Sequence, residues 1–308
     1  MTTDARRSTV NGETNDTHKA PPLVDRLVHI ADLHFWRVVF NPFRLLNKRV
    51  LGNINVYLRR RHEFRMNEGA ELARVVASTG IKTILFTGDF TSTALAEEFE
   101  LAAGFMERLH QKGHDAIVLP GNHDVYTFES RRRKRFEQYF GGYIPKGGYP
   151  ARAKLSGGTP VVLAPTVCPN LFSSKGLIRD EEIKQTAALV NEVDGPVIVA
   201  GHYPLLEKTY GYRLTPGRRL RNAAALRRAL GETERTILYA CGHVHRFSYV
   251  HDEEYPNIRH LSTGALFRHN RKEEITGEFA EIWVHPGDFS VFRHTLGDNW
   301  RRLEEQPR

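Results

Sequence analysis

The four residues Gly121-Asn122-His123-Asp124 are the most informative stretch for the fold. They stand one residue after the short apolar run Ala116–Leu119. A run of this kind, rich in Val, Ile and Leu and bounded by Pro or Gly, is typical of a β-strand buried on both faces. The three polar side chains are therefore expected at the carboxyl end of a strand. Open α/β sheets collect their ligands at this edge, so the stretch predicts a ligand site on such a sheet.

The same order, an apolar run followed by aspartate or histidine, occurs four more times. These polar clusters are Asp32-Leu33-His34, Gly88-Asp89, Gly201-His202 and Gly242-His243-Val244-His245. The glycines beside the polar residues allow other backbone segments to approach closely. Five such clusters predict one site that is assembled from the ends of several strands.

Strand-like and helix-like segments alternate along the chain, which predicts a layered α/β fold. The expected strands are Leu27–Ala31, Thr83–Thr87, Ala116–Leu119, Pro160–Ala164, Val197–Ala200 and Thr236–Ala240. The expected helices are 67–79, 94–111, 129–140, 178–193 and 221–230. Near the end of the chain, Phe279–His285 and Phe289–His294 flank Pro286-Gly287-Asp288. This pattern predicts a hairpin and, with it, a second sheet that is mixed or antiparallel.

The composition is that of a globular protein. The 308 residues are 40% hydrophobic and carry a formal charge of +8, which excludes disorder of the whole chain. No run is long and apolar enough to predict a membrane-spanning helix. The two cysteines exclude a disulfide framework. We expect residues 1–22 to be a disordered polar tail and 23–308 to be one domain. Because the tail lacks the apolar segment of a secretory signal, we expect a cytoplasmic protein.

The five clusters supply carboxylates, imidazoles and one amide, but no thiolate. Such a mixed set of nitrogen and oxygen donors suits Mn²⁺, Fe, Zn²⁺ or Co²⁺. One ion takes about four to six ligands, and the clusters offer more than that, so they predict two ions. A carboxylate can bridge two ions. Asp89, which has no neighbouring ligand in sequence, is the natural residue for this bridge.

In this order, the five clusters resemble the motifs of the calcineurin-like metallophosphoesterase superfamily, and they span residues 32 to 245. The resemblance implies an α/β fold in which two mixed β-sheets form a sandwich flanked by helices. It also implies hydrolysis of a phosphodiester or pyrophosphate bond by in-line attack of a hydroxide held between two divalent ions. Two ions that lower the pKa of bound water support this chemistry independently.

The resemblance implies a role for each residue. The first ion would be held by Asp32, His34 and His245, the second by Asn122, His202 and His243, and both by Asp89. His123 would contact the phosphate and protonate the leaving group, and Asp124 would orient this histidine. A histidine titrating near neutral pH is a suitable proton donor to an alkoxide.

An insertion at 41–61, NPFRLLNKRVLGNINVYLRRR, follows the first cluster. It has six basic residues and no acidic one, and its apolar residues recur at helical spacing. This pattern predicts a basic amphipathic helix, which either packs on the domain or contacts a lipid or a membrane surface. Two further basic runs, 131–135 and 218–221, are either exposed faces or anion-binding surfaces. We expect no specific nucleic-acid partner, because aromatic side chains are not interleaved with the basic ones.

The substrate stays open between two branches of the superfamily. The insertion favours a lipid-linked substrate, as in the UDP-2,3-diacylglucosamine pyrophosphatase branch. The wording of the Gly121–Asp124 and Gly242–His245 motifs fits a soluble cyclic-nucleotide phosphodiesterase equally well. A third alternative, of another class, is a non-catalytic scaffold with the same fold. The sequence does not determine the oligomeric state.

Overall fold

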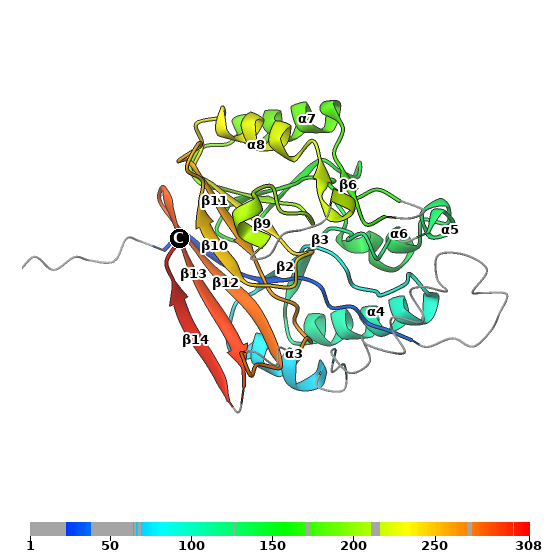
Figure 1. The fold of residues 1–308 in the computed structure, drawn as a ribbon. Helices are drawn as coiled ribbons and strands as arrows, with labels where there is room; N and C mark the ends of the chain where they lie inside the picture. The colour runs from blue at the N-terminus through cyan, green and yellow to red at the C-terminus, as the bar shows by residue number, and fades with distance from the viewer. Residues whose placement is uncertain are drawn as a thin grey trace, which may run out of the picture.

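The computed structural model describes residues 23–37, 64, 66, 69–125, 127–169, 173–210, 216–269, 273–297 and 299–308. The expected tail 1–22 and the basic insertion 41–61 lie outside these residues. Two six-stranded sheets dominate the described part of the chain, with helices on their outer sides (Figure 1). The predicted fold, a sandwich of two mixed sheets flanked by helices, is confirmed.

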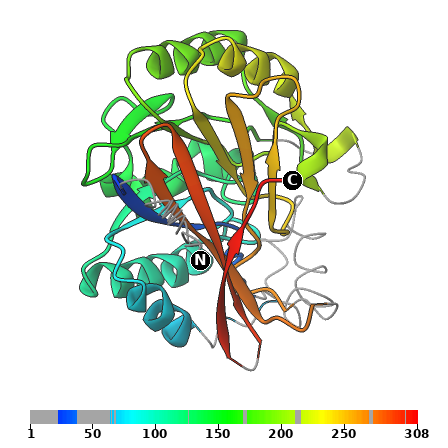
Figure 2. The same cartoon turned by 90° about the vertical axis from the view of Figure 1, so that its left-hand side faces the viewer.

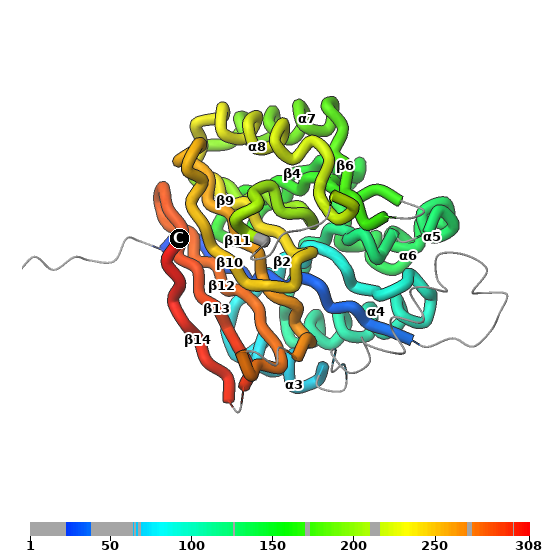
Figure 3. The backbone as a smooth tube through the Cα atoms, viewed as in Figure 1, coloured from blue at the N-terminus to red at the C-terminus, as the bar shows by residue number. Residues whose placement is uncertain are grey.

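The first sheet has the order β14-β13-β12-β1-β2-β3. Its strands β1, β2 and β3 are parallel, and β12, β13 and β14 continue the sheet beyond β1 in antiparallel pairs. Figure 3 shows β12, β13 and β14 side by side. The strands are β1 Asp25–Ile30, β2 Thr83–Phe86, β3 Asp115–Val118, β12 Gly277–His285, β13 Asp288–Leu296 and β14 Trp300–Glu305.

The second sheet has the order β10-β11-β9-β7-β5-β4, with β11, β9, β7 and β5 parallel. Its strands are β4 Ala151–Lys154, β5 Pro160–Leu163, β7 Val197–Ala200, β9 Ile237–Cys241, β10 Ser248–His251 and β11 Ile258–Ser262. A small separate sheet pairs β6 Gly176–Leu177 with β8 Leu220–Arg221.

Helices cover the outer faces of both sheets (Figure 1). On the first sheet lie α3 Gly69–Ser78, α4 Ala96–Gln111 and α6 Arg135–Phe140, with α5 Phe128–Arg132 beside α6. On the second sheet lie α7 Asp180–Asn191 and α8 Ala223–Gly231. Short 3-10 helices span η4 Gly141–Tyr143, η5 Glu207–Tyr210 and η6 Pro216–Arg218.

The apolar strands explain this layering, because each of them is buried on both faces. In β2, Ile84 and Phe86 pack against the helices, and Leu85, between them, packs against the second sheet. In the second sheet, Val199 faces α7 and α8 while Ile198 faces the first sheet. Side chains alternate along a strand, so continuous apolar runs fill three successive core layers.

The predicted hairpin forms, but it belongs to the first sheet. Residues His285 and Asp288 are paired, so Pro286-Gly287 makes a two-residue turn between β12 and β13. The hairpin does not create a second sheet, because β12 pairs along its length with β1. At the chain end, the backbone of Arg308 bonds to Tyr249 and His251 of β10 and so joins the two sheets (Figure 2).

The helix expected at 129–140 is divided into α5 and α6. The break falls at Lys134, whose φ of 50° is left-handed. A left-handed residue cannot continue a right-handed helix. Gly, Asn and Asp adopt this conformation most readily, so a lysine gives no sequence signal for the break.

Candidate metal centre

The five polar clusters meet at the carboxyl ends of strands from both sheets. Asp32 follows β1, Asp89 follows β2 and Asn122 follows β3 in the first sheet, while His202 follows β7 and His243 follows β9 in the second. Backbone hydrogen bonds from Asp32 N to Gly88 O (3.0 Å) and from His34 N to Asp89 O (2.8 Å) join the first two loops. The parallel strands of both sheets thus direct these residues toward one place.

The backbone at this place is unusual. Five of the seven expected ligands have left-handed φ angles, although none of them is glycine: Asp32 54°, His34 49°, Asp89 57°, His243 70° and His245 52°. Such a conformation costs on the order of 1–2 kcal/mol for each non-glycine residue and persists only where the surroundings enforce it. Clusters of these residues are typical of functional sites.

Two glycines let the loops pack backbone against backbone. Gly88 has a φ of 94°, and a Cβ atom on it would collide with the backbone of Gly121. A Cβ atom on Gly121 would in turn collide with the backbone nitrogen and the carboxylate of Asp89. The close approach therefore requires glycine at both positions.

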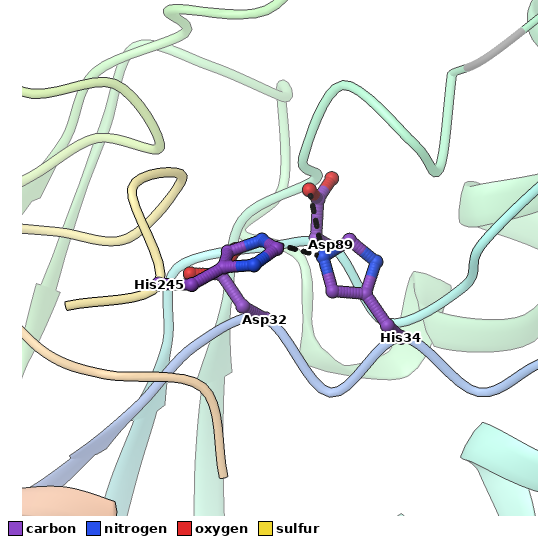
Figure 4. A group of neighbouring side chains, drawn as sticks. All are labelled: Asp32, His34, Asp89 and His245. Atoms are coloured by element: carbon purple, nitrogen blue, oxygen red, sulfur yellow. Dashed lines mark hydrogen bonds and ion pairs between the residues drawn. The ribbon is translucent and has the colours of Figure 1, made fainter. Parts of the chain in front are cut away.

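A first group of donor atoms contains Asp32, His34, Asp89 and His245, and its atoms lie within 4.8 Å of one another. Nε2 of His34 is 2.8 Å from Nε2 of His245 and 3.6 Å from Oδ2 of Asp89. Nε2 of His245 is 3.8 Å from Oδ1 of Asp32. Figure 4 shows the four side chains directed toward one another.

A second group contains Asp89, His202 and His243. Nε2 of His202 lies 3.5 Å from Oδ2 of Asp89. The amide oxygen of Asn122 completes this group, at 3.0 Å from Nε2 of His202 and 3.0 Å from Nδ1 of His243. Asp89 is shared by both groups, so its carboxylate lies between them.

In three of the histidines, the ring nitrogen that points away from the donor groups forms a hydrogen bond with a backbone carbonyl oxygen. The pairs are His34 Nδ1 with Thr91 O (3.3 Å), His202 Nδ1 with Thr87 O (2.8 Å) and His243 Nε2 with Arg218 O (2.9 Å). A carbonyl only accepts, so the bonded nitrogen carries the proton. In the neutral ring the other nitrogen then presents its lone pair to the donor group, which is the arrangement of metal-binding histidines.

These residues fit divalent transition-metal ions. The donors are carboxylate, imidazole and amide atoms, a set that suits Mn²⁺, Fe or Zn²⁺. Two ligands that hold one ion at right angles, each at 2.0–2.1 Å, lie about 3.0 Å apart. The closest donor pairs in the two groups are 2.8 and 3.0 Å apart.

The electrostatics of the centre depend on Asp89. Burial alone would raise the pKa of Asp89, but the imidazoles of His202, His123 and His34 hold it well below its usual range. Burial opposes the charge of His202, yet the carboxylate of Asp89 raises the pKa of His202 to about 9. Burial, followed by the charge of His202, lowers the pKa of His243 to about 3. The centre thus attracts positive charge at Asp89.

His123 lies beside the first donor group. Its backbone N–H donates to Oδ1 of Asp89 at 2.7 Å, and its ring stands edge-on to that of His34, with 4.9 Å between centroids. Nδ1 of His123 lies 2.6 Å from the carbonyl oxygen of Ser92. This carbonyl orients the ring and selects its tautomer. It could not be recognised from the sequence, because every residue has a carbonyl.

Asp124 joins the two loops that carry Asp89 and His123. Its buried carboxylate accepts four hydrogen bonds, from Phe90 N (3.2 Å), Thr91 N (2.9 Å), Thr91 Oγ1 (3.0 Å) and Gly121 N (2.8 Å). The Thr91 hydroxyl also contacts the carbonyl of His123 at 3.3 Å. Burial, followed by the charge of Asp89, raises the pKa of Asp124 to about 7, although the four donors favour the carboxylate.

Comparison with known proteins places these features in a family context. A family model described as calcineurin-like phosphoesterase matches residues 25–247. A search of curated proteins finds no significant match.

Two solved structures have a similar fold. One is a dimetal phosphatase from Danio rerio, with 13% identity, coverage of 92% of this chain and 100% of that chain, and a TM-score of 0.59. The other is the purple acid phosphatase PPD1 from yellow lupin (Lupinus luteus), with 9% identity, coverage of 91% and 53%, and a TM-score of 0.54. The chain thus spans about half the length of the lupin protein. Identities this low show a common fold alone.

Proposed function

Because the chain belongs to the calcineurin-like phosphoesterase family, we propose that it is a dinuclear metal-dependent phosphohydrolase that cleaves a phosphodiester or pyrophosphate bond. One observation carries the proposal: the two donor groups share the buried carboxylate of Asp89. Two-metal hydrolytic sites hold their ions about 3.5–4 Å apart, and one carboxylate can bind both. The donor geometry supports this arrangement.

The expected ligand assignments become proposals about these two groups. The first ion would be held by Asp32, His34 and His245, the second by Asn122, His202 and His243, and both by Asp89. Paired divalent ions lower the pKa of water and stabilise the attacking and leaving oxygens of an in-line displacement. We propose Mn²⁺, Fe or Zn²⁺ as the ions, since all three accept these donors.

His123 is proposed as the catalytic residue that protonates the leaving group. Because Nδ1 is bound to the carbonyl of Ser92 at 2.6 Å, the proton that moves would be the one on Nε2. Asp124 is proposed as a positioning residue, which acts on His123 through the backbone and through Thr91. The resemblance implied that Asp124 orients this histidine, and these contacts support an indirect way of doing so.

The substrate proposal depends on sequence more than on structure. The basic insertion 41–61 favours a lipid-linked pyrophosphate similar to UDP-2,3-diacylglucosamine and a peripheral contact with a membrane, and it lies outside the described residues. A cyclic nucleotide is the alternative substrate. Within the described part of the chain, no helix is long and apolar enough to cross a membrane. A cytoplasmic location also stays a proposal.

Initial rates test the function directly. The Mn²⁺-loaded protein should hydrolyse bis(4-nitrophenyl) phosphate, and it should turn over UDP-2,3-diacylglucosamine in detergent faster than 3′,5′-cyclic AMP. Faster turnover of the cyclic nucleotide would replace the lipid substrate by the alternative one. A protein that binds no transition metal and hydrolyses none of the three compounds would instead be a non-catalytic scaffold.

A further inference from the structure

A cavity of about 290 Å³ borders the loop that carries Asn122 and His123. Its walls come from side chains of this loop, of α5, α6 and Lys134 between them, of Tyr149, and of the segments on either side of Thr166 and at the start of α7, and we call it the side cavity. Pro120 and Asp124 on its wall belong to the loop that carries Asn122 and His123. Pro165 and Val167, also on its wall, flank Thr166, whose hydroxyl accepts the backbone N–H of His202 at 2.9 Å. The side cavity is thus built against the same loops as the donor groups.

The structure separates the basic run 131–135 into two kinds of residue. Arg133 and Arg135 form ion pairs with Glu129, at 3.3 and 3.2 Å. Arg131 and Lys134 line the side cavity, and neither has a carboxylate within 4 Å among the residues that the structure describes. Within the described part of the chain, these two exposed cations on the cavity wall therefore have no carboxylate paired with them.

The wall also carries three carboxylates, those of Asp124, Glu137 and Glu182. Asp124 already accepts four hydrogen bonds, and Glu182 pairs with Arg179 at 2.6 Å. Glu137 is therefore the acidic group that offsets one of the two cations. Glu137 lies near Tyr149, and its charge adds to burial in raising the pKa of that phenol. The hydroxyl of Tyr149 donates to the carbonyl of Val118 at 2.7 Å, which leaves the phenol held in the wall.

The rest of the wall is apolar and limits what can enter. Val125, Phe136, Val167 and Leu177 contribute to it. Ligand pockets for whole small molecules occupy about 300–1,000 Å³, so a cavity at the lower limit accepts one part of a substrate. An organic group with one negative charge matches both the apolar surface and the excess of one cation over Glu137.

We propose that the side cavity binds an anionic group of the substrate, attached to the ester beyond the scissile phosphorus, and that Arg131 and Lys134 recognise its charge. This inference rests on the proposed phosphohydrolase function. It narrows the substrates to phosphoesters that carry a second negative charge on an organic group of about one ring in size.

A matched pair of substrates isolates this charge. Bis(4-nitrophenyl) phosphate and bis(3-carboxy-4-nitrophenyl) phosphate differ by a carboxylate on each ester group, so either orientation in the site is covered. The wild-type enzyme loaded with Mn²⁺ is compared with the double variant Arg131→Gln/Lys134→Gln. The control, Arg132→Gln/Lys184→Gln, removes the same two kinds of charge from exposed positions outside the cavity.

The measured quantity is the ratio of kcat/KM for the carboxylated diester to that for the plain diester. This ratio should fall at least about tenfold in the cavity variant, mainly through KM, because a hydrogen bond to a charged group contributes about this much to binding. It should stay within about twofold in the control, since distant exposed charges are screened by salt. A ratio is unaffected by the fraction of folded enzyme.

Three results would overturn the inference in distinguishable ways. An equal ratio of the two kcat/KM values in all three proteins would show that the cavity does not recognise the carboxylate of the substrate. Sulfate that changes the rate of the plain diester in the wild type and in the control, but not in the cavity variant, would show that the cavity binds a free anion. Failure of the wild-type enzyme to hydrolyse either diester would overturn the proposed function itself, and this inference with it.

Discussion

Asp89 is the residue on which both donor groups depend. Its carboxylate belongs to both groups and is almost fully buried, and it also accepts the backbone N–H of His123 at 2.7 Å. The variant Asp89→Asn removes the charge of this side chain but keeps its shape. It therefore tests the metal-binding role alone, because asparagine can still accept the hydrogen bond from His123.

We predict that Asp89→Asn loses both ions and at least about 100-fold in kcat, since removing the bridge weakens both sites. Metal analysis and initial rates on bis(4-nitrophenyl) phosphate measure this. Asp115→Asn, an exposed carboxylate paired with Lys82 at 3.3 Å, serves as the control and should behave like the wild type. Two retained ions in Asp89→Asn would contradict the bridging role.

His123→Ala should keep its metal and lose about 10²–10⁴-fold in turnover of substrates with poor leaving groups. The loss should be much smaller for 4-nitrophenyl esters, because a good leaving group departs without a proton. Rates on an alkyl and on a nitrophenyl diester, together with metal analysis, test the assignment. An equal loss on both substrates, or loss of the metal, would show that His123 has another role.

The buried side chain of His29 should make the free energy of unfolding depend on pH. Burial lowers its pKa to about 3, and Nε2 lies 2.9 Å from the Thr87 hydroxyl. In the unfolded chain the pKa is about 6.5, so the unfolded state binds the extra proton between these values. The contribution of neutral His29 is complete above about pH 6.5 and is lost as the pH falls, by about 1.4 kcal/mol per unit.

Denaturant titrations at pH 7.5 and pH 5 compare the wild type with His29→Gln, which keeps a hydrogen-bonding side chain but does not titrate. The variant should lose less stability between the two pH values than the wild type does. Parallel pH dependences would show that His29 does not stay neutral in the folded protein.

At the scale of single residues, the sequence indicated the side chains of the centre but not the groups that orient them. Aspartate, histidine and asparagine at strand ends are recognisable by residue type. The carbonyls of Ser92 and Arg218 are not, because only the folded backbone brings them to His123 and His243. The left-handed φ angles of the five expected ligands had no sequence signal either.

At the scale of elements, buried strands were the most predictable feature. The strands expected at 83–87 and 197–200 end within one residue of their observed limits, because continuous apolar runs bounded by Gly or Asp leave little freedom. Pairing was less predictable. The hairpin β12–β13 was recognisable from its turn, but its partner β1 lies about 250 residues away in sequence, beyond the reach of a local pattern.

The loops after β2 and β3 depend on glycine. We predict that Gly121→Ala displaces Asp89, with which its new Cβ would collide, and that it lowers both metal binding and stability. Gly104→Ala in α4 meets only the end of the Arg108 side chain and should raise stability by about 0.5–1 kcal/mol, as alanine favours a helix. Denaturant unfolding and metal analysis compare the two. Normal metal binding in Gly121→Ala would disprove the close-packing argument.

At the scale of the whole molecule, the sandwich brings the two donor groups together. Asp32, Asp89 and Asn122 come from the first sheet, and His202 and His243 come from the second. The alternation of strands and helices predicted a layered α/β fold, and the resemblance implied a sandwich of two mixed sheets. How the two sheets face each other depends on core contacts such as that of Leu85 with the second sheet. The basic insertion at 41–61, outside the described residues, leaves the lipid substrate as a prediction from sequence.

Two ions that share the carboxylate of Asp89 would be magnetically coupled, and electron paramagnetic resonance of the Mn²⁺-loaded protein detects this coupling. We predict two bound Mn²⁺ ions per chain and the spectrum of a coupled pair, which disappears in Asp89→Asn. A single bound ion, or two ions that give only the signal of isolated Mn²⁺, would show that Asp89 does not bridge two ions.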